Sequence, residues 1–171
     1  DGNVIYRDVL VLDYDDVPKL RLLHDAITET LKGVAWFWHT TYSHTTEQGR
    51  VRLYTPLSER ISADDYRKYT KVLASKIGHP VDEGSFQPSR AMALPVYQKD
   101  KYPFLYKYND ALILDTKTLN QWCDKYKEKH KESTKFKYPK RRDNEFWKSI
   151  AFGVSTGNRN QTLTSLIGVL L

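Results

Sequence analysis

The feature that most constrains this chain is an apolar run that leads directly into acidic residues. Val9 to Leu12 are four consecutive apolar residues, two of them β-branched, and they predict a buried strand. Asp13, Asp15 and Asp16 follow within four positions. Because side chains alternate along a strand, Asp13 and Asp15 project from the same face. Neighbouring carboxylates repel each other unless a cation lies between them, so the pattern favours a divalent metal site.

Helix capping is the alternative explanation for these acids. Asp16 suits this role because Pro18 lies just inside the predicted start of the next helix, where the Asp16 side chain can accept hydrogen bonds from free amide groups. Asp13 and Asp15 are harder to explain as caps. We therefore expect Asp16 to be a cap and keep Asp13 and Asp15 as candidate metal ligands.

Hydrophobic periodicity predicts strands that alternate with helices. Strands are expected over residues 3–12, 34–42, 51–57, 91–97 and 111–114, and helices over residues 17–32, 62–77 and 116–131. A turn at residues 45–49 joins the second and third strands in a hairpin, and residues 99–108 are interpreted as a basic, aromatic loop or edge. This order argues for an α+β or mixed α/β fold rather than a doubly wound parallel sheet, and α+β is the class we predict.

Positive charge is concentrated in one part of the chain. The formal net charge is +6, yet residues 1–98 hold 12 Lys and Arg against 13 Asp and Glu. Residues 99–142 hold 13 against 6, and residues 143–171 hold two of each. The excess therefore lies where a contact surface for a phosphate backbone would concentrate it. A solvated, lysine-rich helix would have the same composition, so charge alone leaves both readings open.

Composition argues against several other classes of protein. No apolar run is long enough to span a bilayer, and the first residues carry no basic or apolar leader, so we expect a cytoplasmic protein without membrane contact. The single cysteine, Cys123, permits neither an internal disulfide nor a cysteine-based zinc site. His39 and His44 are five residues apart and do not share a strand face, which disfavours a histidine metal site.

Further charged residues accompany the acidic pair. Arg50 and Arg52 share one face of a predicted strand and could bracket a polyphosphate, while Asp82 adds a third carboxylate and Arg90 enters the next predicted strand. This order resembles the catalytic core of archaeo-eukaryotic primases and primase-polymerases, above all those in replication proteins of phages, plasmids and bacterial mobile islands. The likeness is carried by LDYDDV, TTYSHTTEQGRVRLYTPLS and IGHPVDEGSFQPSRAMALP, within residues 9–98.

The resemblance implies a site for nucleotidyl transfer. Asp13, Asp15 and Asp82 would be the catalytic carboxylates and would hold two Mg²⁺ or Mn²⁺ ions. The second motif of the family has a histidine on a strand against the nucleotide phosphates. This chain departs from that pattern: Arg50 and Arg52 would stand where the family has a small residue and that histidine, or His44 would be the histidine if the motif lies earlier. Additional groups that would neutralise the triphosphate are Arg90, Lys99 and Lys101.

The resemblance also implies a domain plan and a nucleic-acid surface. Mixed sheets with an RRM-like unit and flanking helices would form a catalytic core over residues 1–132. A basic linker over residues 133–143 and the start of a helical domain over residues 144–171 would follow, and the stretch GNRNQTL is similar to the opening of that domain. The residues expected to contact nucleic acid are Lys125, Lys129, Lys137, Lys140, Arg141 and Arg142.

The predicted function is that of a primase or primase-polymerase domain of a mobile-element replication protein. It would use nucleoside triphosphates on a single-stranded DNA template, together with a replicative helicase. Two alternatives stay open. The first is a non-catalytic DNA-binding initiator module with the same fold. The second is a phosphatase of the haloacid-dehalogenase type, because an apolar strand before DxDxV is its nucleophile motif, although Asp110 and Asp115 are poor candidates for its late acidic pair.

Overall fold

The computed structural model describes residues 4–92, 95–96 and 101–133, with side chains as far as residue 127. The chain divides into two compact units, residues 1–130 and 131–171. The predicted linker, after Ser133, and the predicted helical domain over 144–171 lie outside the described residues.

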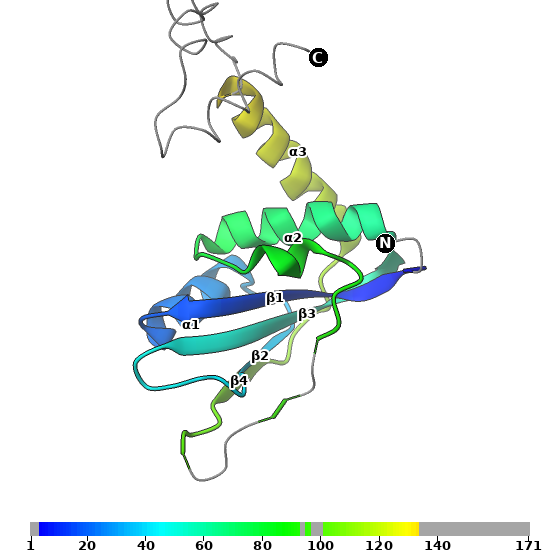
Figure 1. Cartoon of the computed structure of the whole chain (residues 1–171). Coiled ribbons are helices and arrows are strands. Elements are labelled where there is room, and N and C mark those ends of the chain that lie inside the picture. The colour runs from blue at the N-terminus through cyan, green and yellow to red at the C-terminus, as the bar shows by residue number, and fades with distance from the viewer. Residues whose placement is uncertain (1–3, 93–94, 97–100, 134–171) are drawn as a thin grey trace, which may run out of the picture. The chain divides into compact units, whose positions relative to one another are not determined.

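The first unit is built on an antiparallel sheet of four strands among the described residues (Figure 1). The strands are β1 (Arg7–Val17), β2 (Trp36–Thr40), β3 (Gly49–Ile61) and β4 (Tyr106–Asn109), in the order β1-β3-β2-β4. Because β1 and β2 both run antiparallel to β3, they are parallel to each other. Helix α1 (Leu20–Thr30) connects them, which makes a split β-α-β unit.

The elements follow one another as β-α-β-β-α-β, since helix α2 (Ala63–Ile77) lies between β3 and β4 in the chain. Strand β4 pairs with β2 and so forms the sheet edge opposite β1. Helix α3 (Thr116–Ser133) follows β4. The predicted α+β class is confirmed.

Alternation of side chains gives the sheet one core face and one open face. Leu10, Leu12 and Tyr14 of β1 are fully buried and belong to the hydrophobic core, together with Val51 and Leu53 of β3. Helices α1 and α2 cover this face with apolar side chains that belong to the same core, among them Leu23, Ile27, Tyr66, Leu73 and Ile77. The intervening strand residues, Asp13 and Arg52 among them, therefore project from the opposite face.

Helix α2 begins and ends at residues whose types favour helix termini. The hydroxyl oxygen of Ser62 accepts a hydrogen bond from the Asp65 amide at 3.1 Å and caps the helix. Gly78 ends it in the left-handed conformation, at φ +75°, which a residue without a side chain adopts at little cost. Among the described residues, no helix is both long enough and apolar enough to cross a bilayer.

The prediction that Asp16 caps the first helix is wrong. Strand β1 does not end at Leu12 but continues through the acidic residues to Val17, because it pairs with β3 past an irregularity between Tyr14 and Val17. Asp16 is therefore an exposed strand residue. Helix α1 begins later than predicted, with Lys19 at its N-cap position and no side-chain capping bond.

The strands predicted near the end of the unit are misplaced. Residues 91–92 and 95–96 form no strand, and the rest of the predicted strand 91–97 lies outside the described residues. Residues 111–114 contribute only isolated bridges at Leu112 and Leu114. The fourth strand begins instead within residues 99–108, the segment interpreted as a loop or edge, and it forms the edge of the sheet because it pairs with β2. Periodicity within a segment cannot show which edge is available.

Gly49, at the start of β3, is required by the close approach of β1. A methyl group at this position would lie 2.5 Å from the carbonyl oxygen of Val17. We expect Gly49→Ala to destabilise the unit by about 1–3 kcal/mol, because the backbone of β1 would have to shift. Gly78→Ala is the control, since it strains the backbone but meets no atom within 4 Å. Urea unfolding midpoints measure both, and a Gly49→Ala variant as stable as the wild type would contradict this role of Gly49.

Candidate functional site

A row of functional side chains crosses the open face of the sheet. In the strand register Asp13 of β1 lies opposite Arg52 of β3, Arg52 lies opposite His39 of β2, and His39 lies opposite Tyr106 of β4. Residues opposite each other in an antiparallel sheet project from the same face. Four strands thus place a carboxylate, a guanidinium, an imidazole and a phenol side by side.

Asp13 and Arg52 form a buried ion pair at the centre of the site. Arg52 Nη2 donates to Asp13 Oδ2 at 2.7 Å, and the two side chains are only 13% and 5% exposed. Burial lowers the pKa of Arg52, but the hydrogen bond and the charge of Asp13 more than offset it, so the net pKa lies above the ordinary value. Arg52 therefore stays charged, and its charge is compensated by Asp13.

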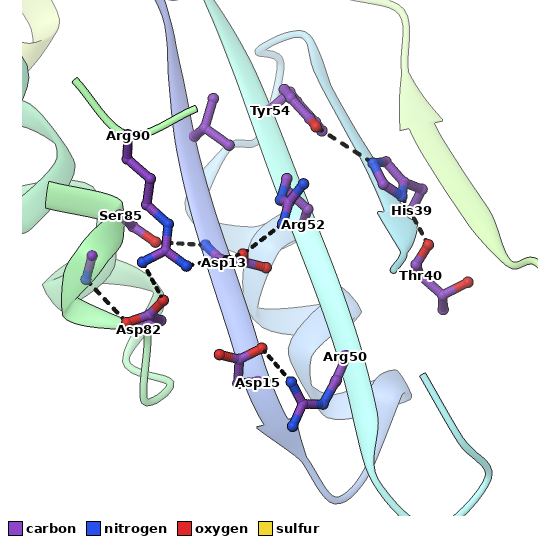
Figure 2. A network of polar contacts seen from close by, with 12 residues as sticks. Asp13, Asp15, His39, Thr40, Arg50, Arg52, Tyr54, Asp82, Ser85 and Arg90 are labelled. Carbon is purple, nitrogen blue, oxygen red and sulfur yellow. Dashed lines mark hydrogen bonds and ion pairs between the residues drawn. The ribbon is translucent and has the colours of Figure 1, made fainter. Parts of the chain in front are cut away.

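Asp15 and Arg50 form a second and more accessible pair, toward the hairpin that joins β2 and β3 (Figure 2). Arg50 Nη1 donates to Asp15 Oδ1 at 3.1 Å, and both side chains are partly exposed. The side-chain amide of Gln48 donates to the Asp15 carbonyl at 3.3 Å and ties the hairpin to β1.

A short 3-10 helix, η1 (Glu83–Phe86), brings Asp82 next to Asp13. The Asp82 amide donates to the Asp13 carbonyl at 2.8 Å, and the Asp13 amide donates to the Ser85 hydroxyl at 2.8 Å. Both backbone groups of Asp13 are thus satisfied by the segment that covers the outer edge of β1. Asp82 also caps η1, because its Oδ1 accepts from the Gly84 amide at 3.0 Å.

Arg90 links the carboxylates of Asp82 and Asp13. Its Nη1 lies 2.7 Å from Asp82 Oδ2, and its Nη2 lies 3.9 Å from Asp13 Oδ2 (Figure 2). A methyl group on Gly84 would overlap this guanidinium, so the glycine leaves the space through which Arg90 passes. Arg7 fixes the segment from behind, because it donates to the carbonyls of Pro88 and Arg90.

His39 is the residue of the site that the sequence analysis did not select. It is 1% exposed, and burial is the main cause that lowers its pKa, so the neutral form is favoured near pH 7. Its Nδ1 lies 2.8 Å from the Thr40 carbonyl, which can only accept, so Nδ1 carries the proton. Nε2 then accepts from the Tyr54 hydroxyl at 3.5 Å. The alternation within residues 36–40 predicts that His39 projects from the strand face opposite Trp36 and Trp38, but the sequence does not show that Arg52 lies beside it.

The other predicted residues are placed differently. His44 lies in the hairpin connection, where its Nδ1 accepts the Arg50 amide at 3.2 Å and burial lowers its pKa. Lys101 and Lys125 are exposed, the latter on α3. Lys129 belongs to α3, but its side chain is not described. The predicted residues outside the described part of the chain are Lys99, Lys137, Lys140, Arg141 and Arg142.

A pocket of about 380 Å³ opens over the Asp13–Arg52–His39 row. Pockets of roughly 300–1,000 Å³ accommodate small-molecule ligands in proteins. Its walls mix cationic, anionic and hydroxyl groups, which suits a charged ligand better than an apolar one. The lining residues are Asp13, Asp15, His39, Thr41, Tyr42, Ser43, Arg50, Arg52 and Val96.

The carboxylates fit a divalent ion in their chemistry, although arginines now neutralise them. Oδ1 of Asp13 is buried and accepts no hydrogen bond from any described residue, so one oxygen remains for another partner. Carboxylate oxygens are the ligands that Mg²⁺ and Mn²⁺ prefer. Within the described ranges, however, no three His, Cys, Asp or Glu side chains are grouped closely enough to hold a metal ion. A metal site would therefore require the carboxylates to move toward one another as well as to leave the arginines that now pair with them.

The fold and the site define an α+β domain with a pocket of alternating acidic and basic groups on the open face of its sheet. A family model described as the VapE N-terminal domain matches residues 1–147, and the chain belongs to this family. Domains of this family occur in replication proteins of phages, plasmids and mobile elements. Comparison with the curated proteins and with the solved structures finds no match.

The burial of Asp13 and Arg52 predicts a large difference between two similar substitutions. We expect Asp13→Asn to destabilise the unit by about 3 kcal/mol, because it leaves Arg52 charged without its buried partner. Asp15→Asn, the matched control, should cost less than about 1 kcal/mol, since that pair is partly hydrated. Urea unfolding at pH 7 gives both values. A stabilised Asp13→Asn variant would contradict the view that Arg52 compensates this carboxylate.

Proposed function

We propose that this domain binds a nucleoside triphosphate in the pocket over Asp13 and transfers its nucleotidyl group to the 3′-hydroxyl of a strand growing on single-stranded DNA, with release of pyrophosphate. The domain would then be the metal-dependent primase-polymerase core of a mobile-element replication protein. One observation carries the proposal. Three aspartates from two separate segments alternate with three arginines beside one pocket, as Figure 2 shows for Asp13, Arg52, Asp15, Arg50, Asp82 and Arg90.

The arginines supply the binding of the phosphates. Arg50 and Arg52 line the pocket, and their planar guanidinium groups match phosphate oxygens with two hydrogen bonds each. Arg90 is 37% exposed and can turn toward the same ligand. When the ligand binds, each guanidinium would leave its aspartate and pair with a phosphate instead. Each arginine would therefore still have an anionic partner.

The same exchange would free the carboxylates to hold Mg²⁺ or Mn²⁺. Asp13, through its unpartnered Oδ1, Asp82 and Asp15 are the residues that would bind it. A bound divalent ion would supply activation of the attacking hydroxyl and neutralise charge on the phosphates. The side chains of β1 and η1 are pre-positioned for this role by the backbone bonds between Asp13, Asp82 and Ser85.

His39 would orient the phosphates from the floor of the pocket. Its position on a strand beside Arg52 agrees with the histidine-bearing strand of archaeo-eukaryotic primases that the sequence resembles. The neutral imidazole donates to the Thr40 carbonyl and accepts from the Tyr54 hydroxyl, so it would donate to a phosphate only after Nε2 takes up a proton, which the negative charge of the phosphates would favour. This assignment replaces His44, whose ring supports the hairpin. The split β-α-β unit also supports an archaeo-eukaryotic primase-like core as part of the proposal.

A non-catalytic DNA-binding module is the second candidate function. It is favoured by the neutralisation of every carboxylate of the site by an arginine, which gives a complete network without any ligand. A phosphatase of the haloacid-dehalogenase type finds less support. That mechanism requires a nucleophile at the end of a strand in a parallel sheet, whereas neighbouring named strands of the described sheet pair antiparallel and Asp13 lies inside an edge strand.

Primer synthesis by the whole chain distinguishes these candidates. We expect labelled nucleotides to be incorporated on a single-stranded template with Mn²⁺ or Mg²⁺, and Asp15→Asn or Asp82→Asn to lower the rate by about 100-fold or more, because the transition-state charge loses stabilisation. Asp16→Asn is the matched control, since it removes the same charge from the same strand outside the network. If the wild type makes no product with either metal on any template while still binding DNA, the module function holds instead.

Metal binding offers a readout that does not depend on turnover. Because Arg90 competes for Asp82 and Asp13, we expect Arg90→Met to bind Mn²⁺ several-fold more tightly than the wild type when no nucleotide is present. The same variant should bind a nucleoside triphosphate more weakly. Titration of free Mn²⁺ by electron paramagnetic resonance measures the first effect.

The control for this titration is Arg21→Met, which removes an exposed ion pair with Asp25 on α1. It should leave Mn²⁺ binding unchanged. If Arg90→Met binds Mn²⁺ no better than this control, the carboxylates are not a metal site that the arginine occupies.

A further inference from the structure

Aromatic rings form a connected group on the open face of the sheet, beside the Asp–Arg network. We call this group the aromatic face, and it consists of Phe37, Tyr54, Phe104, Tyr106 and Tyr108. The ring of Phe37 lies 5.9 Å from that of Tyr54 and 6.5 Å from that of Tyr106, measured between centroids. Phe104 extends the group, 6.0 Å from Tyr106, and Tyr108 lies opposite Phe37 in the strand register.

These rings are not part of the buried hydrophobic core. Tyr106 and Tyr108 are 55% and 67% exposed, although both belong to a paired strand. On the other face of β2, Trp36 and Trp38 are each only 5% exposed and pack in the core. The core face of the sheet is thus filled by its own aromatic residues, and the aromatic face offers ring surface to a partner.

The aromatic face adjoins the groups that would bind phosphate. Arg52 and Tyr54 are two residues apart on the same face of β3, so their rows lie roughly 7 Å from each other. One row reads Asp13, Arg52, His39 and Tyr106 across the sheet. The next row contains Tyr54, Phe37 and Tyr108. Phosphate-binding and ring-binding chemistry therefore lie one row apart on one surface.

Charge complementarity indicates which partner fits. Strand β3, which carries Tyr54 of the aromatic face, also carries Arg50 and Arg52 on the same side, four and two residues from that ring. A partner for this surface combines a repeating negative charge with flat rings. Single-stranded nucleic acid has both, whereas duplex DNA keeps the faces of its bases stacked inside. An acidic protein would match the charge, but it would not offer a series of flat rings that can stack on these side chains.

We infer that the aromatic face stacks unpaired bases of single-stranded DNA, with Tyr106 and Tyr108 as its main contacts. The inference rests on the proposed function for the identity of the strand as a DNA template, but it concerns binding alone. Phosphates of the same strand would contact cationic side chains next to the rings. Such stacking tolerates any base sequence, because every base has a ring face.

The test is binding of the whole chain to a fluorescent oligothymidine, measured by anisotropy in EDTA and without nucleotide. We expect Tyr106→Ala and Tyr108→Ala each to weaken binding about 5- to 100-fold, the range for the loss of one stacked base. Tyr106→Phe and Tyr108→Phe keep the ring and should bind like the wild type. Tyr6→Ala is the matched control, because it removes an exposed tyrosine that lies outside the aromatic face.

An abasic oligonucleotide of the same length separates stacking from charge. The alanine variants and the wild type should bind this probe equally, since it offers phosphates but no rings. The inference is overturned if the alanine variants bind oligothymidine as tightly as the wild type, or if they lose as much affinity for the abasic probe. Because the assay contains neither metal nor nucleotide, a failure of primer synthesis leaves its outcome unaffected, and the two proposals fail separately.

Discussion

The structure of the site depends on Asp13, which engages its neighbours through both backbone and side chain. Its amide and carbonyl pair with Ser85 and Asp82, and its Oδ2 lies against Arg52 and within reach of Arg90. A buried carboxylate is costly unless its charge is matched, and here the matching groups come from β3 and from the segment after η1. The same residue therefore closes the edge of β1 and sets the geometry of the network.

Charge compensation stabilises the three carboxylates of the site. Asp13, Asp15 and Asp82 each face an arginine, so the repulsion expected between the acids is removed within the protein itself. Arginine suits this role because its guanidinium remains charged when it is partly buried. It also binds phosphate as well as carboxylate, so an incoming nucleotide could replace one partner with another at little cost in ion pairing.

The open face of the sheet combines two chemistries in adjacent rows. Helices α1 and α2 cover the core face, and the opposite face holds the acidic and basic groups near the hairpin and the aromatic rings nearest β4. Strand alternation makes this separation strict: Trp36 and Trp38 enter the core, while Phe37 and His39 project away from it. A short strand such as β2 thereby contributes both to stability and to the site.

The sequence by itself determined the α+β class, the hairpin, the helix between Ser62 and Gly78, and the shared face of Asp13 and Asp15, because these follow from periodicity and capping within short segments. Only the tertiary structure decided that β1 continues past its acids, that β4 forms at Tyr106–Asn109, and that His39 joins the site while His44 supports a turn. Each of these depends on pairing with a strand or loop distant in the chain. The periodicity of a short segment does not show which distant segment it will pair with. That choice is made by hydrogen bonds between strand edges and by ion pairs between the segments.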